Sequence, residues 1–99
     1  MKTVFDVIVV GSGIAGLYAA HKAAGFARVC LLTKGALHET NTWLAQGGIA
    51  AALGEDDTPN DHFKDTLAAG AGACDPKAVA VLVEEGPKRI KELLSLGTP

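Results

Sequence analysis

Short apolar runs alternate with glycine-rich turns in the first part of the 99-residue chain, and amphipathic stretches fill its last part. Residues 3–10, TVFDVIVV, are β-branched and nearly uncharged, a pattern typical of a strand buried on both faces of a parallel sheet. Residues 28–33, RVCLLT, have the same character. Between them, residues 14–24 are spaced for one helical face, and Gly25 is placed as a C-terminal stop. The inward face of this helix is expected to consist of Ile14, Leu17, Tyr18, His21 and Ala24. The order strand, helix, strand predicts a right-handed βαβ unit and an α/β fold.

Residues 34–57 have no strong helical period and contain many glycines, so we expect a loop with a short strand at 49–53. Two helix starts follow, because a capping side chain precedes a proline at 58–59 and again at 75–76. The first of these helices is expected to stop at Gly70. An apolar stripe runs through the second, but the Gly-Pro pair at 86–87 interrupts it. We therefore expect either two short helices or one kinked helix.

The segment GSGIAG joins the first predicted strand to the first predicted helix and places glycines at 11, 13 and 16. In the G-x-G-x-x-G pattern, Gly11 permits the tight turn, Gly13 lets the backbone approach a pyrophosphate, and Gly16 lets the helix pack close to the sheet. A glycine turn with only a structural role is the alternative. The position between a buried strand and a helix favours dinucleotide binding and a Rossmann-like domain.

The residue that follows the second strand indicates which dinucleotide is bound. Proteins that bind NAD usually carry an acidic residue about 20 positions after the glycines, where it holds the ribose hydroxyls. Here Thr33 takes that place, followed by Lys34. A hydroxyl is a poorer acceptor than a carboxylate, so this difference counts against an ordinary NAD-linked dehydrogenase.

A second glycine pair, Gly47-Gly48, lies within the nearly uncharged stretch NTWLAQGGIAAAL. Without side chains, the main chain there could lie against a flat flavin ring, with hydrogen bonds from Gln46 and the Thr42 hydroxyl. A glycine-rich surface turn is the alternative, and the spacing alone does not decide between them.

Four blocks, DVIVVGSGIAGLYAA, LLTKG, NTWLAQGGIAAAL and DDTPNDHFKDTLAAGAGACDPKAV, resemble the opening of the L-aspartate oxidase family. These flavoproteins belong to the succinate dehydrogenase/fumarate reductase superfamily, and the similarity covers essentially the whole chain. The resemblance implies an FAD site formed by the glycine loop, the lysine after the second strand and the segment that leads into the Q-G-G turn. Together with the residues chosen on spacing, the predicted cofactor-binding residues are Gly11, Ser12, Gly13, Ile14, Ala15, Gly16, Thr33, Lys34, Asn41, Thr42, Trp43, Leu44, Ala45, Gln46, Gly47 and Gly48.

The resemblance also implies a reaction, the oxidation of L-aspartate to iminoaspartate with oxygen or fumarate as acceptor. This would be the first step towards quinolinate and NAD, with a functional link to quinolinate synthase. Asn41 stands where the membrane-complex relatives carry a histidine bonded to the flavin, which implies non-covalent FAD. A fumarate reductase or succinate dehydrogenase subunit and a non-catalytic nucleotide-binding scaffold are the alternatives.

The chain is expected to be the N-terminal portion, residues 1–99, of an FAD-binding domain without its substrate-capping domain. In the family the groups that grip the dicarboxylate lie further along the chain, so no catalytic residue is predicted within these residues. Two strands and three helices alone cannot make a doubly wound sheet. We therefore expect the isolated chain to bind FAD poorly and to be inactive.

The composition of the chain mainly argues against certain classes of function. The net charge of −2 gives no basic field for nucleic acid, and no uncharged run approaches the ~20 residues of a membrane span. No metal-binding spacing is present, and the chain is predicted to be cytoplasmic with Cys30 and Cys74 as free thiols.

Four further candidates are expected to be structural or solvated. His21 is expected to be a packed or rim residue and not a catalyst. The His38-Glu39 pair and the helical pair His62 and Asp65 are expected to face water, and Cys74 is expected to be structural. Trp43 either lies beside the flavin or pins the loop to the core.

Overall fold

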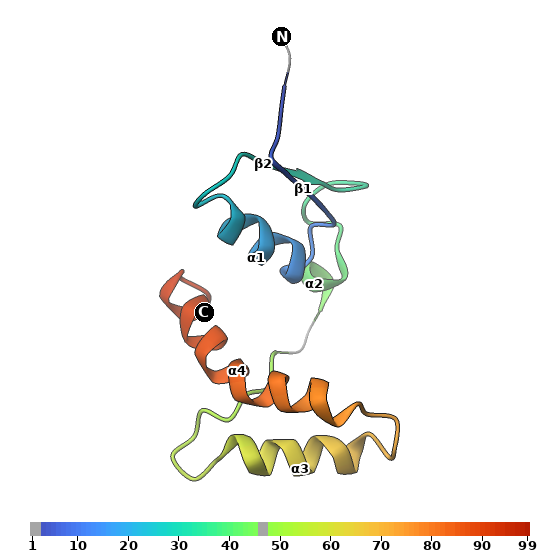
Figure 1. Ribbon diagram of the computed structural model, residues 1–99, viewed down its shortest axis with the longest axis vertical. Coiled ribbons are helices and arrows are strands. Elements are labelled where there is room, and N and C mark those ends of the chain that lie inside the picture. Colours follow the sequence, from blue (N-terminus) through green and yellow to red (C-terminus); the bar gives the residue numbers. More distant parts are fainter. Residues whose placement is uncertain (1–2, 46–47) are drawn as a thin grey trace. The chain divides into compact units, whose positions relative to one another are not determined.

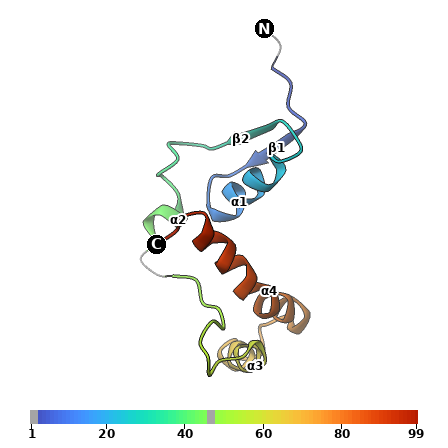
Figure 2. The same ribbon diagram turned by 90° about the vertical axis from the view of Figure 1, so that its left-hand side faces the viewer.

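The computed structural model describes residues 3–45 and 48–99 (Figures 1 and 2). The chain divides between Gly48 and Ile49 into two compact units, which are considered separately. The first contains strands β1 (Val7–Val10) and β2 (Val29–Leu32) and helices α1 (Ile14–Ala23) and α2 (Asn41–Leu44). The second contains helices α3 (Pro59–Ala69) and α4 (Pro76–Ser95).

The first unit is the predicted parallel strand–helix–strand arrangement, so the α/β fold class is confirmed. β1 and β2 pair in register from Val7 opposite Val29 to Val10 opposite Leu32. At the start of both strands, Asp6 and Arg28 are joined through main chain and side chains: Asp6 N donates to Arg28 O at 2.9 Å, and Arg28 N donates to the Asp6 carboxylate at 2.9 Å. The strands are shorter than expected, because pairing requires a partner as well as an apolar run: residues 3–6 of the first expected strand and residues 28 and 33 of the second lie outside them.

One face of this small sheet is covered by α1, as Figure 2 shows, and the other is not covered by the described part of the chain. Val7 and Val9 are half-buried, whereas Ile8 and Val10 on the opposite face are 61% and 81% exposed. The prediction that the strands are buried on both faces is therefore wrong for this chain. An apolar run indicates that both faces of a strand can be buried, but it does not indicate which part of the protein covers each face.

The inward face of α1 also differs from the prediction. Ile14 and Leu17 are more than 40% exposed, and His21 and Ala24 are exposed as well. The half-buried positions of this helix are Gly16, Tyr18, Ala20 and Ala23. Three of these four residues are small, and small side chains let the helix axis approach the strands closely. Tyr18 is the one residue of the expected inward face that is half-buried.

The first unit contains a helix, α2, that the sequence pattern does not predict, and the second lacks a strand that it does predict. α2 begins after Thr40, whose hydroxyl oxygen accepts a hydrogen bond from Trp43 N at 3.1 Å. Residues 49–53 form no strand, and Leu53 N instead donates to Ala51 O within a turn. The expected strand is wrong because no neighbouring strand pairs with it among the described residues.

In the second unit, α3 begins and ends where the sequence predicts. The Thr58 hydroxyl accepts a hydrogen bond from Asp61 N at 3.1 Å and donates to the Asp61 carboxylate at 2.9 Å. Both bonds satisfy groups at the start of the helix that would otherwise need water. Gly70 follows the last helical residue as the C-cap.

α4 is a single helix that changes direction near its middle, where Pro87 removes a main-chain donor (Figure 1). Of the two alternatives from the sequence, the kinked helix is confirmed. Asp75 caps the start by accepting from Lys77 N at 2.9 Å. Val79 and Val83 are the buried residues of this helix, which packs beside α3. No helix in the described residues is long and apolar enough to cross a membrane.

Candidate dinucleotide-binding site

The loop between β1 and α1 is shaped by its glycines. Gly11 has φ of +110°, a left-handed conformation that other residues rarely adopt, and its N–H donates to Leu32 O at 2.8 Å. A β-carbon at Gly16 would collide with the carbonyl oxygen of Gly11 and lie 3.5 Å from Val9 Cγ1. Gly11 thus forms the turn, and Gly16 permits α1 to approach it.

Ser12 fixes the same loop to the end of β2. Its side chain is buried, with 4% exposure, and its hydroxyl donates to the Thr33 hydroxyl oxygen at 2.9 Å. Thr33, the residue predicted to replace the acidic ribose ligand, therefore already accepts one hydrogen bond from within the protein. The carboxyl ends of the two strands are held together by this pair.

A third segment, residues 39–42, completes the site. Ile14 N donates to the Thr42 hydroxyl oxygen at 3.1 Å, which brings the start of α2 to the start of α1. Glu39 closes the preceding turn by accepting a hydrogen bond from Ala36 N at 3.0 Å. His38 and Glu39 are both exposed, as expected, although the Glu39 carboxylate is held by this main-chain donor.

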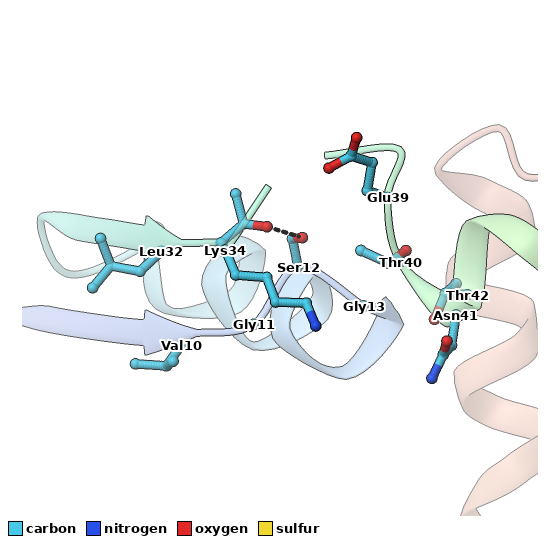
Figure 3. Close-up of a pocket in the computed structure, with 11 residues that line it drawn as sticks. Val10, Gly11, Ser12, Gly13, Leu32, Lys34, Glu39, Thr40, Asn41 and Thr42 are labelled. Carbon is cyan, nitrogen blue, oxygen red and sulfur yellow. Dashed lines mark hydrogen bonds between the residues drawn. The ribbon is translucent and has the colours of Figure 1, made fainter. Parts of the chain in front are cut away.

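The three segments surround a hollow of about 640 Å³, drawn in Figure 3. Its size falls within the range of about 300–1,000 Å³ that is usual for small-molecule sites. The residues that line it are Val10, Gly11, Ser12, Gly13, Leu32, Thr33, Lys34, Glu39, Thr40, Asn41 and Thr42. Among the described residues of that lining, Lys34 is the only cation and Glu39 the only anion. Lys34 lies directly after β2, where an anionic ligand would gain from its charge.

Seven of the predicted cofactor-binding residues line this hollow, namely Gly11, Ser12, Gly13, Thr33, Lys34, Asn41 and Thr42. The predicted residues that do not line it are Ile14, Ala15, Gly16, Trp43, Leu44, Ala45 and Gly48. Gln46 and Gly47 lie outside the described residues. Sequence analysis missed Val10, Leu32, Glu39 and Thr40. The two strand residues could have been found, because ligands bind at the carboxyl ends of parallel strands.

Trp43 does not pin its loop to a core. The side chain is 70% exposed, and its ring lies edge-on to His38 with the centroids 6.2 Å apart. Of the two hypotheses for Trp43, the anchoring one is therefore wrong, while a position beside the flavin stays a prediction. His21, which was expected to be a packed or rim residue of α1, is exposed, so the packed alternative is wrong.

His62 was expected to face water, and this is also wrong. It is half-buried, and its Nδ1 atom is buried without a hydrogen-bond partner in the described part of the chain. His62 and Asp65 line a small hollow with Ala50, Ala51 and Asp57. The prediction used only the spacing of residues within the helix. It therefore did not include the segment before α3, which lines the hollow beside His62.

Cys74 contacts α3, which supports its expected structural role. Its Sγ atom lies 3.6 Å from the carbonyl oxygen of Thr66 at the end of α3, to which it donates. Both cysteines are free thiols.

The geometry of the glycine loop and of the hollow fits the diphosphate part of a dinucleotide. Gly13 is the N-cap of α1 and has no side chain to cover the helix start, where Ile14 N–H donates to the Thr42 hydroxyl and an anion would bind beside it. The hollow begins at this point and extends to Lys34. A parallel βαβ unit with these glycine constraints, and with a hollow at the carboxyl ends of its strands, defines a dinucleotide-binding unit of the Rossmann type.

The chain belongs to the FAD-binding domain family, whose model, described as "FAD binding domain", matches residues 6–99. It is 54% identical over 94 residues to the L-aspartate oxidase of Streptomyces coelicolor, covering 93% of this chain and 16% of that protein. It is 54% identical over 93 residues to the L-aspartate oxidase of Synechocystis, covering 94% and 17%. The chloroplastic L-aspartate oxidase of Oryza sativa is 45% identical over 93 residues, with 94% and 14% covered.

Among solved structures, a chain of the Mycobacterium smegmatis Sdh1 complex in the apo form is similar. It is 33% identical with a TM-score of 0.88, and the match covers 96% of this chain and 17% of that chain. The present chain thus spans 14–17% of the length of these four proteins. The cofactor is FAD, and the family is one of flavin oxidoreductases.

Proposed function

We propose that this chain supplies the first part of the FAD-binding domain of an enzyme that oxidises L-aspartate to iminoaspartate. The observation that carries this proposal is the 54% identity to an L-aspartate oxidase across 93% of the chain. The hollow at the strand ends supports the cofactor half of the proposal, since three separate segments of the resemblance line it. The reaction would take place in the cytoplasm and would be the first step towards quinolinate and NAD, with quinolinate synthase as its functional partner.

Each segment has a distinct task in holding FAD. The main chain at Gly11–Gly13 and the start of α1 would receive the diphosphate, and the Lys34 ammonium would balance its charge. Asn41 and Thr42 would close the opposite wall, and the residues from Trp43 to Gly48 would follow the cofactor towards the flavin ring. When bound, FAD supplies the hydride acceptor, whose electrons pass on to oxygen or fumarate. The chain itself binds and orients the cofactor.

We further propose that FAD is held without a covalent bond. Asn41 lies in the wall of the hollow, at the position where the resemblance places a flavin-linked histidine in membrane-complex relatives. An amide side chain is not a nucleophile that could make this link. Acid precipitation of the full-length protein should therefore leave the yellow cofactor in the supernatant. Colour that stays with the precipitate would contradict this part of the proposal.

The experiment that tests the reaction compares substrates. Full-length protein supplied with L-aspartate should reduce its flavin and, with oxygen as acceptor, produce peroxide, whereas succinate should leave the flavin oxidised. Reduction by succinate and not by aspartate would favour the second candidate, a succinate dehydrogenase or fumarate reductase flavoprotein subunit. The similarity to the chain from the Sdh1 complex is the observation that supports this candidate.

A non-enzymatic nucleotide-binding scaffold is separated from both by a visible spectrum. Flavin absorbs in the visible region, so purified full-length protein that is colourless, and is still colourless after incubation with FAD and removal of the free cofactor, would contradict the enzymatic proposals together. A yellow protein that neither substrate reduces would favour the scaffold.

A further inference from the structure

Helix α1 begins without a side-chain cap of its own. The N-cap residue is Gly13, which has no side chain to accept a hydrogen bond from the first turn. The acceptor comes instead from a residue 28 positions away, because Ile14 N donates to the Thr42 hydroxyl oxygen at 3.1 Å. Thr42 thus does for α1 what Thr58 and Asp75 do locally for α3 and α4.

The missing side chain at Gly13 and the hydroxyl of Thr42 depend on each other. A β-carbon at Gly13 would lie 3.3 Å from Thr42 Oγ1, which is closer than ordinary van der Waals contact. With serine or aspartate at position 13, the usual local caps, the Thr42 hydroxyl would have to give way by a few tenths of an ångström. Glycine at this position leaves the Thr42 hydroxyl room to cap the helix from a distance.

We infer that Thr42 is a positioning residue, which caps α1 from a distance and so holds the start of α2 against the glycine loop. This inference rests on the proposed FAD site, of which both segments form a wall. The Thr42 oxygen accepts from Ile14, and its hydroxyl hydrogen has no acceptor among the residues that the structure describes. A hydroxyl can accept and donate at once, so this hydrogen is available to a diphosphate oxygen.

The first test is a double-mutant cycle on FAD binding, measured by titrating the full-length apoprotein and following flavin fluorescence. Gly13→Ala and Thr42→Ala should each raise the Kd about tenfold, the value of one good hydrogen bond. The double variant should bind no more weakly than Gly13→Ala alone, because either change breaks the same contact. Losses that multiply to about a hundredfold would overturn the inference.

Thr40→Ala is the matched control for this cycle. Thr40 lies in the same segment and lines the same hollow, but its hydroxyl oxygen accepts from Trp43 N and not from α1. In the double variant of Thr40→Ala and Gly13→Ala, the increase in Kd should therefore equal the product of the two single increases. A coupling as strong as that of Thr42 would show that the whole segment moves, which contradicts a specific role for Thr42.

The second test does not use FAD. In the full-length apoprotein, Thr42→Val should raise hydrogen exchange at the Ile14 amide about fivefold or more, as expected for loss of a cap. Thr42→Ser keeps the hydroxyl and should leave this exchange unchanged. Equal exchange in the valine and serine variants would overturn the inference. If Thr42→Val does not fold, Thr42→Ala gives the same measurement. A wild-type protein that binds no FAD would defeat the proposed function, while the exchange at Ile14 would still decide the role of Thr42.

Discussion

Gly16→Ala tests whether the approach of α1 to the glycine turn is as close as the structure requires. Alanine is a better helix former than glycine, so on propensity alone the change should stabilise the protein by about 1 kcal/mol. The new β-carbon, however, would collide with the carbonyl oxygen of Gly11. Overpacking costs about 1–3 kcal/mol, and the upper end applies because the opposing atom belongs to the main chain and cannot rotate away. The expected net loss in the free energy of unfolding is therefore about 2 kcal/mol.

Urea unfolding of the full-length apoprotein measures this difference directly through the midpoint at constant m-value. Gly86→Ala is the matched control, since Gly86 also lies within a helix but a β-carbon there would meet only Ala51 Cβ at 3.7 Å. Its position before a proline offsets the gain in propensity, so we expect a change of less than about 1 kcal/mol. If Gly16→Ala were as stable as this control and bound FAD equally well, the argument from close approach would be refuted.

Two further predictions concern the ends of elements. Thr58→Ala should lower the free energy of unfolding by about 1 kcal/mol, since Asp61 N loses its acceptor, and urea unfolding with Thr58→Ser as the control checks this. The pKa of Asp6 lies below its ordinary value, first because of the hydrogen bond from the Arg28 main chain and then because of the Arg28 side chain. The stability from this pair is therefore present above the unfolded pKa of about 3.9 and is lost as the pH falls through the lower folded value. Asp6→Asn should reduce the acid dependence of the unfolding midpoint; an unchanged pH profile would contradict the assignment.

The parts of the fold that follow from local chemistry were predictable from the sequence. The βαβ order, the left-handed turn at Gly11 and the starts of α3 and α4 each depend on residues a few positions apart. For the same reason, the glycine loop and Lys34 could be placed in the candidate site. A helix cap, a turn and an amphipathic period each involve residues within a short stretch of chain. The sequence of that stretch is therefore enough to predict them.

The features that were missed depend on distant partners. The inward face of α1 is chosen by how closely the strands allow it to approach, and periodicity does not contain that distance. His62 turns inward because the hollow that it lines includes Ala50 and Ala51 from the preceding segment. The four-residue helix α2 is too short to show a period, and a local Thr40 cap was its only signal.

The contact between Gly13 and Thr42 changes what the glycine pattern means in this chain. Gly11 is required by its own main-chain conformation and Gly16 by a neighbouring carbonyl group, and both constraints arise within the βαβ unit. Gly13 is constrained from outside that unit, by a hydroxyl 29 positions further along the chain. The pattern G-x-G-x-x-G is therefore incomplete as a description of this site unless the residue at 42 is included. A chain with the same three glycines but no hydroxyl at the position of Thr42 would offer the ligand a differently capped helix, even though its loop had the same sequence.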